Sequence, residues 1–170
     1  MEVLKETGKL LSKSLLFEES KKCDYIDTFS VSLKRSNIDS QELITAFFYS
    51  SPKWVDKLFV LRNKLVDVIG LKSEMANIAQ LNPPYTKNQQ LGAFKIYEIT
   101  EDEVVLGEDD KHLNFRVSLI IERGTKNRLV LSAIVKTNNL IGKIYFFIIK
   151  RFHQIIVSVM IKRMVKNIDK

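Results

Sequence analysis

The alternation of hydrophobic and polar residues predicts a β-strand over residues 24–33, where the sequence reads DYIDTFSVSL. Side chains of a strand point alternately to its two faces, so Tyr25, Phe29 and Val31 share one apolar face. Asp27 has the same parity, which places a carboxylate on that face. Because a buried carboxylate needs a partner, we expect Asp27 to be hydrogen-bonded or paired with a cation.

Two helices are expected after this strand. Asp39 and Ser40 provide the side-chain oxygens that cap a helix, so a short helix is predicted over residues 41–49. The second helix begins at Ser51–Pro52, because serine is a good cap and proline fits the first turn, and it ends at Gly70.

Arg62 lies within the apolar arc of the second helix, beside Trp54 and Leu58. A buried guanidinium must be paired, so we expect a bidentate ion pair between Arg62 and Asp27. The alternative is that Arg62 reaches solvent along its aliphatic stem.

Four further strand-like runs follow, at residues 92–100, 103–107, 112–122 and 128–137. Their connections are short, and short connections join neighbouring antiparallel strands because parallel strands need a long crossover. The chain then ends in a helix over about residues 140–167, with Asn138 or Asn139 as its cap.

The last helix has an apolar stripe that we expect to face the sheet. The stripe consists of Ile141, Tyr145, Ile148, Ile149, Phe152, Ile156 and Val159. Since Arg163 interrupts the same face, the last two turns are expected to project past the sheet. The pattern predicts an α+β fold with a sheet folded around a long C-terminal helix. Residues 1–23 are expected to form an N-terminal arm, and residues 24–170 a single domain.

Composition narrows the class of protein. Of the 170 residues, 45% are hydrophobic and 28% are charged, which is typical of a soluble globular domain. The single cysteine, Cys23, excludes an internal disulfide and a cysteine-based zinc site. The formal net charge is +7, and residues 141–170 contain seven Lys or Arg against one acidic residue, Asp169.

The distribution of charge and hydropathy bears on partners and location. No basic run is interleaved with aromatic residues or glycines, so no nucleic-acid partner is expected. The run Ile144–Ile149 is far shorter than the ~20 apolar residues of a transmembrane helix. The first 17 residues include Glu2 and Glu6 and no apolar block of signal-peptide length. We therefore expect a cytoplasmic protein that is not transmembrane.

Several short motifs follow one another after residue 23. They are DY-x-D at 24–27, P-x-W at 52–54, LRN at 61–63, GEDDKHLNFRVS at 107–118, N-x-x-GKIY at 139–145 and FH at 152–153. In this order and spacing, the chain resembles the helix-grip domains of the START-like, or SRPBCC, superfamily, which includes polyketide cyclases, lipid-transfer domains and the birch-pollen allergen. It looks most like a bacterial family of unknown function whose members also occur fused to Rossmann-type epimerase domains. Arg151 is a departure, because members often have a proline before the Phe-His pair.

The resemblance implies a curved antiparallel sheet that grips the C-terminal helix, with a cavity between them. It implies no specific reaction, because members bind, transfer or transform different apolar molecules. The expected function is binding of an apolar small molecule or lipid in that cavity. The candidate ligand contacts are Asp27, Trp54, Arg62, Arg116, Tyr145, Phe152 and His153.

An alternative function is enzymatic, with His112 or His153 as the catalytic residue. Asp110, His112 and Arg116 share one strand face, so a cyclase, dehydratase or isomerase could use a histidine as general base and Arg62 or Arg116 to steady an oxyanion. The competing interpretation is that this row is a solvated outer face and that His153 is a histidine at the edge of the core.

No metal or cofactor is expected. Glu108, Asp109, Asp110 and His112 are crowded together, unlike the spaced ligands of a zinc site, and no glycine-rich phosphate loop is present. A third possible function is an interaction module, in which the basic end of the last helix docks on an acidic protein or an anionic membrane surface.

Overall fold

The computed structural model describes residues 2–7, 10–52 and 81–170. The elements in these ranges are β1 (Leu4–Thr7), α1 (Phe17–Ser20), β2 (Tyr25–Ser32), α2 (Ser40–Tyr49), β3 (Gln90–Leu91), β4 (Phe94–Ile99), β5 (Glu103–Asp109), β6 (Leu113–Glu122), β7 (Arg128–Thr137) and α4 (Leu140–Ile168). The predicted second helix lies outside the described residues, except for Ser51 and Pro52 at its start.

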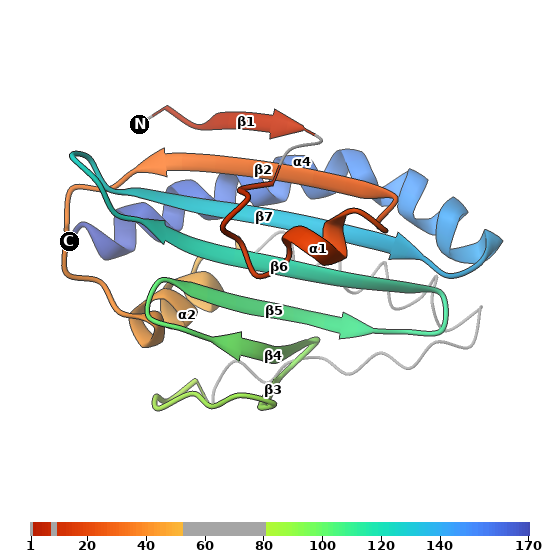
Figure 1. Ribbon diagram of the computed structural model, residues 1–170, viewed down its shortest axis with the longest axis horizontal. Coiled ribbons are helices and arrows are strands. Elements are labelled where there is room, and N and C mark those ends of the chain that lie inside the picture. The colour runs from red at the N-terminus through yellow and green to blue at the C-terminus, as the bar shows by residue number, and fades with distance from the viewer. Residues whose placement is uncertain (1, 8–9, 53–80) are drawn as a thin grey trace.

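The strands form one antiparallel sheet in the order β1-β2-β7-β6-β5-β4-β3 (Figure 1). Helices α2 and α4 lie behind the sheet in this view, and α1 lies in front of it. We call the side that α2 and α4 cover the inner face and the opposite side the outer face. The predicted α+β fold is confirmed: a curved antiparallel sheet with a long C-terminal helix, as in a helix-grip fold.

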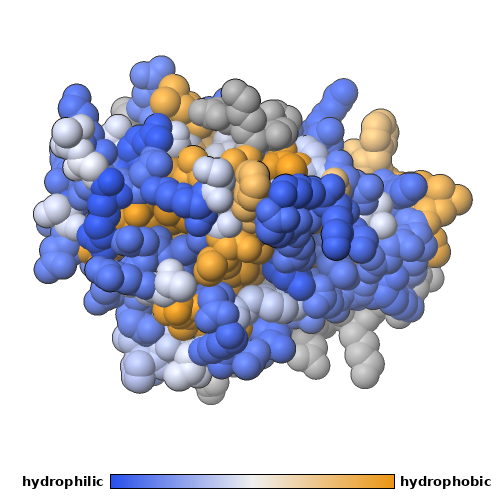
Figure 2. Space-filling view, in the orientation of Figure 1, coloured by the Kyte–Doolittle hydropathy of each residue, from blue (hydrophilic) through white to orange (hydrophobic). Residues whose placement is uncertain are grey.

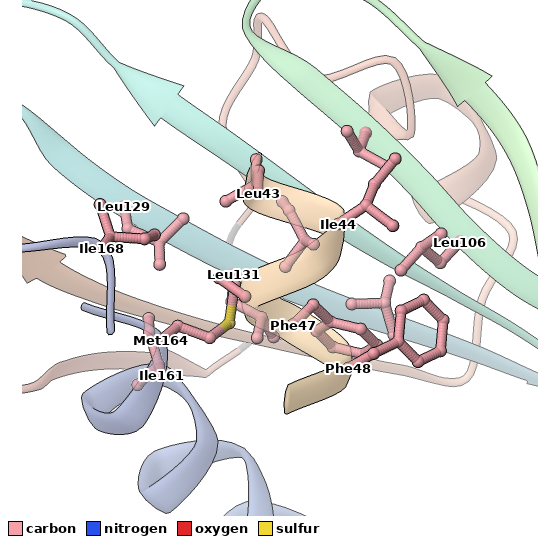
Figure 3. Close-up of a cluster of buried hydrophobic side chains, with 14 of the residues drawn as sticks. Leu43, Ile44, Phe47, Phe48, Leu106, Leu129, Leu131, Ile161, Met164 and Ile168 are labelled. Carbon is pink, nitrogen blue, oxygen red and sulfur yellow. The ribbon is translucent and has the colours of Figure 1, made fainter. Parts of the chain in front are cut away.

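The core lies between the inner face and the two longer helices. Figure 3 shows α2 and the C-terminal part of α4 directed at the sheet, with Phe47 of α2 and Met164 of α4 close to Leu131 of β7. Phe47 is 4% exposed, and Met164 and Leu131 are at most 1% exposed. Asp39 caps α2, because its side chain accepts a hydrogen bond from the Glu42 amide.

Helix α4 packs on the sheet with a different face from the predicted one. Its buried residues are Gly142, Phe146, Val157, Ile161, Met164, Val165 and Ile168. No residue of the predicted stripe is fully buried: Ile148 is 57% and Phe152 51% accessible, and Tyr145, Ile149, Ile156 and Val159 are only partly buried. The prediction that the last two turns project past the sheet is also wrong, because Ile161 and Met164 are fully buried there.

The physical reason is that the first half of α4 is apolar on every side. Residues 140–149 are apolar apart from Gly142, Lys143 and Tyr145, so their periodicity does not identify one buried face. The second half has a clear spacing of three and four residues at Val157, Ile161, Met164 and Ile168, and this spacing sets the orientation of the helix.

The N-terminal residues are built into the sheet. β1 pairs with β2 as an antiparallel edge strand, an element that the weak sequence pattern did not predict. Residues 14–20 cross the outer face, where the buried Glu103 carboxylate of β5 accepts hydrogen bonds from the Ser14 and Ser118 hydroxyls and the Leu15 amide. These bonds satisfy a buried charge and hold the N-terminal segment on the sheet.

Candidate functional site

A cluster of polar side chains lies on the inner face beneath α4. Asp27 of β2 is 0% exposed, as its strand parity predicted. The Tyr25 hydroxyl donates to Asp27 Oδ2 at 2.5 Å, and Lys5 Nζ of β1 lies 3.9 Å from the same oxygen. Gln154 of α4 donates to the Tyr25 hydroxyl at 2.8 Å, so the cluster joins the sheet to the helix.

His153 lies at the edge of this cluster. Its ring meets the Tyr25 ring edge-on, with 6.4 Å between centroids. Its Nδ1 atom is buried and has no hydrogen-bond partner within the described ranges. Burial lowers the pKa of the His153 imidazole below its ordinary value, because the charged form loses hydration, although the nearby Asp27 opposes this shift. The imidazole is therefore neutral at physiological pH and has an unused buried polar atom.

Tyr25 is held as a hydrogen-bond donor. Burial raises the pKa of its hydroxyl, and the hydrogen bond to Asp27 raises it further. The Lys150 ammonium lies 4.9 Å from the centroid of the Tyr25 ring, and the Phe146 ring packs edge-on against it at 5.0 Å. The phenol group therefore stays protonated, and its ring is contacted by two side chains of α4.

Apolar side chains continue from this cluster across the sheet. Tyr25 pairs with Val135, and Val135 pairs with Phe115, so the three lie in register on β2, β7 and β6. The Phe94 ring on β4 packs edge-on against Phe115 at 5.5 Å. We call Tyr25, Val135, Phe115 and Phe94 the apolar row. Phe94 and Phe115 are only partly buried, although they face the core. The inner face thus combines an apolar surface with polar groups at one end.

Arg116, a predicted ligand contact, is instead on the outer face. Its guanidinium bonds both oxygens of Asp109, at 2.8 and 3.0 Å, and lies 3.8 Å from the centroid of the Tyr97 ring. Burial and the hydrogen bond to Asp109 raise the pKa of Tyr97 to about 12. The alternative interpretation, that the strand face carrying Arg116 is solvated, is also wrong. Arg116 and Ser118 on that face are buried under the N-terminal segment. Arg116 is therefore a structural residue on the opposite side from His153.

His112, the other candidate base, lies at the start of β6 against the first turn of α4. Its Nδ1 is 3.1 Å from the Asn139 side-chain oxygen, and that oxygen also caps the helix by accepting from the Gly142 amide. The His112 Nε2 atom is buried without a hydrogen-bond partner within the described part of the chain. This environment ties His112 to the helix start and not to the cluster around His153.

The other predicted contacts are dispersed. Tyr145 is partly buried and Phe152 is exposed. Trp54 and Arg62 lie outside the described residues, so the predicted pair between Arg62 and Asp27 stays a prediction. Of the predicted contacts that are described, the structure brings together Asp27 and His153.

Sequence reasoning missed Gln154, Lys150 and Phe115 as members of this region. The stripe predicted from the sequence leaves Gln154 and Lys150 on the side of the helix away from the sheet. Val157 and Ile161 are buried, and residues three or four positions apart lie on the same side of a helix. Counting back three residues from Val157 gives Gln154, and a further four gives Lys150, so this spacing would have placed both toward the sheet.

A separate pocket of about 350 Å³ lies on the outer face, between the N-terminal segment and strands β2 and β7. Apolar side chains such as Leu11, Phe17 and Val130 line it. Three of its polar side chains are already bonded within the chain: Thr28 pairs with Ser132 at 3.0 Å, Arg128 pairs with Glu122, and the Ser20 hydroxyl donates to the Phe17 carbonyl. This pocket therefore lacks the unpaired buried atom found on the inner face.

Comparison with known proteins identifies a family but no activity. The model of a family described as protein of unknown function (DUF2867) matches residues 20–160, from the last residue of α1 into the second half of α4. No curated protein and no solved structure matches the chain.

Proposed function

The chain belongs to the DUF2867 family, and we propose that it is a START-like domain that binds an apolar small molecule or lipid bearing a hydroxyl group. The proposed site is the inner face of the sheet beneath the first half of α4. The helix-grip arrangement of sheet and C-terminal helix supports the START-like assignment, and the inner-face side chains support the ligand class.

The observation that carries this proposal is the buried Nδ1 of His153, which lies beside an apolar surface and has no hydrogen-bond partner in residues 2–7, 10–52 and 81–170. Buried polar atoms are nearly always hydrogen-bonded, so an unpaired one suggests a partner that binds there. Binding sites typically combine an apolar lining with a few fixed polar groups. Here Phe94 and Phe115 supply the lining, and His153 supplies the polar contact.

A hydroxyl is the simplest group that fits this contact. A neutral imidazole nitrogen is a donor in one tautomer and an acceptor in the other, and a hydroxyl pairs with either. The adjacent Asp27 carboxylate is buried and already accepts from Tyr25, so a second carboxylate would meet like charge. The charge of Asp27 therefore favours an alcohol over a fatty acid as the ligand.

An enzymatic function finds less support. Arg116 cannot steady an oxyanion at His153, because it is bonded to Asp109 on the other face of the sheet. The described cations near the cluster are Lys5, beside Asp27, and Lys150, over the Tyr25 ring. We therefore propose binding and assign no reaction.

The test is isothermal titration calorimetry with 1-dodecanol and with its methyl ether, which lacks the hydrogen-bond donor. The wild type should bind both and prefer the alcohol. Phe115→Ala should weaken the binding of both by about tenfold, because it removes apolar contact area. His153→Phe should remove the preference for the alcohol while leaving the ether bound.

Phe152→Ala is the matched control, because Phe152 precedes His153 but is 51% exposed. It should bind both compounds as the wild type does. The proposal fails if neither compound binds, or if Phe152→Ala weakens binding as much as Phe115→Ala.

A further inference from the structure

The side of α4 that faces away from the sheet is apolar over its first four turns. Seven of the ten exposed large hydrophobic residues within the described ranges lie there. They are Leu140, Ile141, Ile144, Phe147, Ile148, Phe152 and Ile155, with exposed fractions from 43 to 81%. We call these residues the outward apolar face. Figure 2 shows hydrophobic side chains projecting at the right-hand edge of the molecule, where α4 begins in Figure 1.

Such a surface is unusual for a monomer in water. Soluble proteins expose single apolar side chains commonly but contiguous apolar patches rarely, and larger patches mark interaction sites. Phe147, midway along the length of this face, is 81% exposed. The outward apolar face is therefore expected to be covered by a partner.

The charges of α4 identify the chemistry of that partner. Between Leu140 and Ile168 the helix has no Asp or Glu. It has six cations, all of them exposed: Lys143, Lys150, Arg151, Lys162, Arg163 and Lys166. At 100° per residue, Arg151, Lys162 and Lys166 lie on the same side as the outward apolar face, whereas Lys143 and Lys150 lie on the side of the buried Ile161 and Ile168. An apolar helix face that is followed by cations on the same side is suited to a lipid bilayer, which has an apolar interior and an anionic headgroup surface.

The helix is attached to the fold in a way that favours lying on a bilayer over crossing it. By length and composition, α4 is long and apolar enough to span a membrane. However, Val157, Ile161, Met164 and Ile168 hold its second half in the core. At its start, Gly142 lies directly against the His112 backbone. Both ends of α4 are thus attached to the rest of the fold on their inward side, so a bilayer would meet the helix on its outward side.

We propose that the outward apolar face of α4 docks on an anionic lipid bilayer, with the helix lying in the plane of the interface. The Leu, Ile and Phe side chains enter the boundary between headgroups and acyl chains. The cations at the C-terminal end contact lipid phosphates, and Arg151 extends its guanidinium group to the headgroups. This proposal does not depend on the ligand site, because it uses the opposite side of the helix.

Vesicle co-sedimentation of the full chain tests the proposal. The vesicles contain phosphatidylcholine alone or phosphatidylcholine with phosphatidylglycerol, each at low and at high salt. Binding should require phosphatidylglycerol and weaken at high salt. Phe147→Ser should lower the partition coefficient by about tenfold or more, because the phenyl group no longer enters the bilayer. Tyr49→Ser, at an aromatic residue that is 58% exposed on α2, is the matched control and should bind normally.

The contribution of charge is tested separately. The double variant Lys162→Gln/Lys166→Gln should lose roughly fivefold in binding per lysine, and Lys34→Gln/Lys126→Gln, at two other exposed lysines, should change little. The proposal is overturned if no vesicle binds, or if Phe147→Ser binds as tightly as Tyr49→Ser. It is also overturned if Phe147→Ser and Ile144→Ser unfold, since the face would then be part of the core, or if the wild type is a dimer that Phe147→Ser makes monomeric.

Discussion

At the scale of single residues, the Tyr25 hydroxyl joins three parts of the inner-face cluster. It donates to the Asp27 carboxylate of its own strand and accepts from Gln154 on α4. A hydrogen bond to a buried charged group stabilises more than one between neutral groups. The hydroxyl therefore both satisfies Asp27 and fixes the helix over β2.

Removing this hydroxyl should destabilise the protein measurably. We expect Tyr25→Phe to lower the free energy of unfolding by about 1–3 kcal/mol, because Asp27 loses a buried donor. Tyr97→Phe is the control: its hydroxyl bonds the exposed Asp109, so its loss should cost well under about 1 kcal/mol. Urea denaturation of both variants makes the comparison, and equal losses would contradict the role given to Tyr25.

His153 should titrate below the ordinary histidine value of 6.5, because burial disfavours its charged form. The chain has two histidines, so NMR spectra of His112→Gln and His153→Gln assign both imidazole signals. A titration of the wild type then gives the pKa of His153. A value at or above the ordinary one would place the ring in water and remove it from the proposed site.

The same shift predicts how stability depends on pH. The unfolded chain binds a proton at His153 near the ordinary pKa, while the folded chain stays neutral to lower pH. The contribution of His153 to stability is therefore complete above about pH 6.5 and is lost as the pH falls toward the folded-state pKa. His153→Phe should lack this loss, whereas the wild type should show it in urea denaturation between about pH 7 and 5. Parallel pH profiles for the two proteins would contradict the expectation.

The burial of Asp27 followed from strand parity, because a strand offers only two faces and its apolar neighbours identify the inner one. The position of His153 did not follow, because a helix offers a continuous range of directions. It depends on contacts of Ile161 and Met164, which lie two to three turns away.

At the scale of elements, the start of α4 depends on the small size of Gly142. A Cβ atom on Gly142 would lie 2.0 Å from the His112 carbonyl oxygen and 2.8 Å from its carbonyl carbon, so the backbone would have to move. At Gly124, in the β6–β7 connection, the nearest atom to a Cβ would be 3.9 Å away. The two glycines thus differ in the room available for a Cβ atom, so their alanine variants form a matched pair.

Gly142→Ala should therefore lower the free energy of unfolding by about 1–3 kcal/mol, as overpacking in a tight contact does. Gly124→Ala should change it by less than about 0.5 kcal/mol. Thermal and urea denaturation measure both. If Gly142→Ala is as stable as the wild type, α4 does not begin against His112.

The orientation of α4 is tested by a second pair of variants. Met164→Ala should cost about 2–5 kcal/mol, because it leaves a cavity in the core. Ile148→Ala, at a residue that is 57% exposed, should cost less than about 1 kcal/mol. If Ile148→Ala costs more stability than Met164→Ala, the stripe predicted from the sequence packs on the sheet instead of the face that contains Met164.

At the scale of the whole molecule, the sheet has two faces with different chemistry. The outer face carries paired groups that fasten the N-terminal segment, such as Glu103 with Ser14 and Ser118. The inner face carries the apolar row and the Nδ1 atom of His153, which has no hydrogen-bond partner in the part of the chain that the structure describes. The antiparallel order of the later strands was predictable from their short connections, whereas β1 was not, because an edge strand of four residues leaves little periodic signal.

These two faces give two places where an apolar ligand could bind, and one NMR measurement separates them. With 1-dodecanol bound, nuclear Overhauser effects should connect the methylene protons of the ligand to the ring protons of Phe115 and Phe94, and its terminal CH₂OH protons to the ring of Tyr25 or His153. This result would place the ligand on the inner face with its hydroxyl at the polar cluster. Effects to Phe17 and Leu11 in the outer pocket, with none to Phe115, would contradict the proposed site.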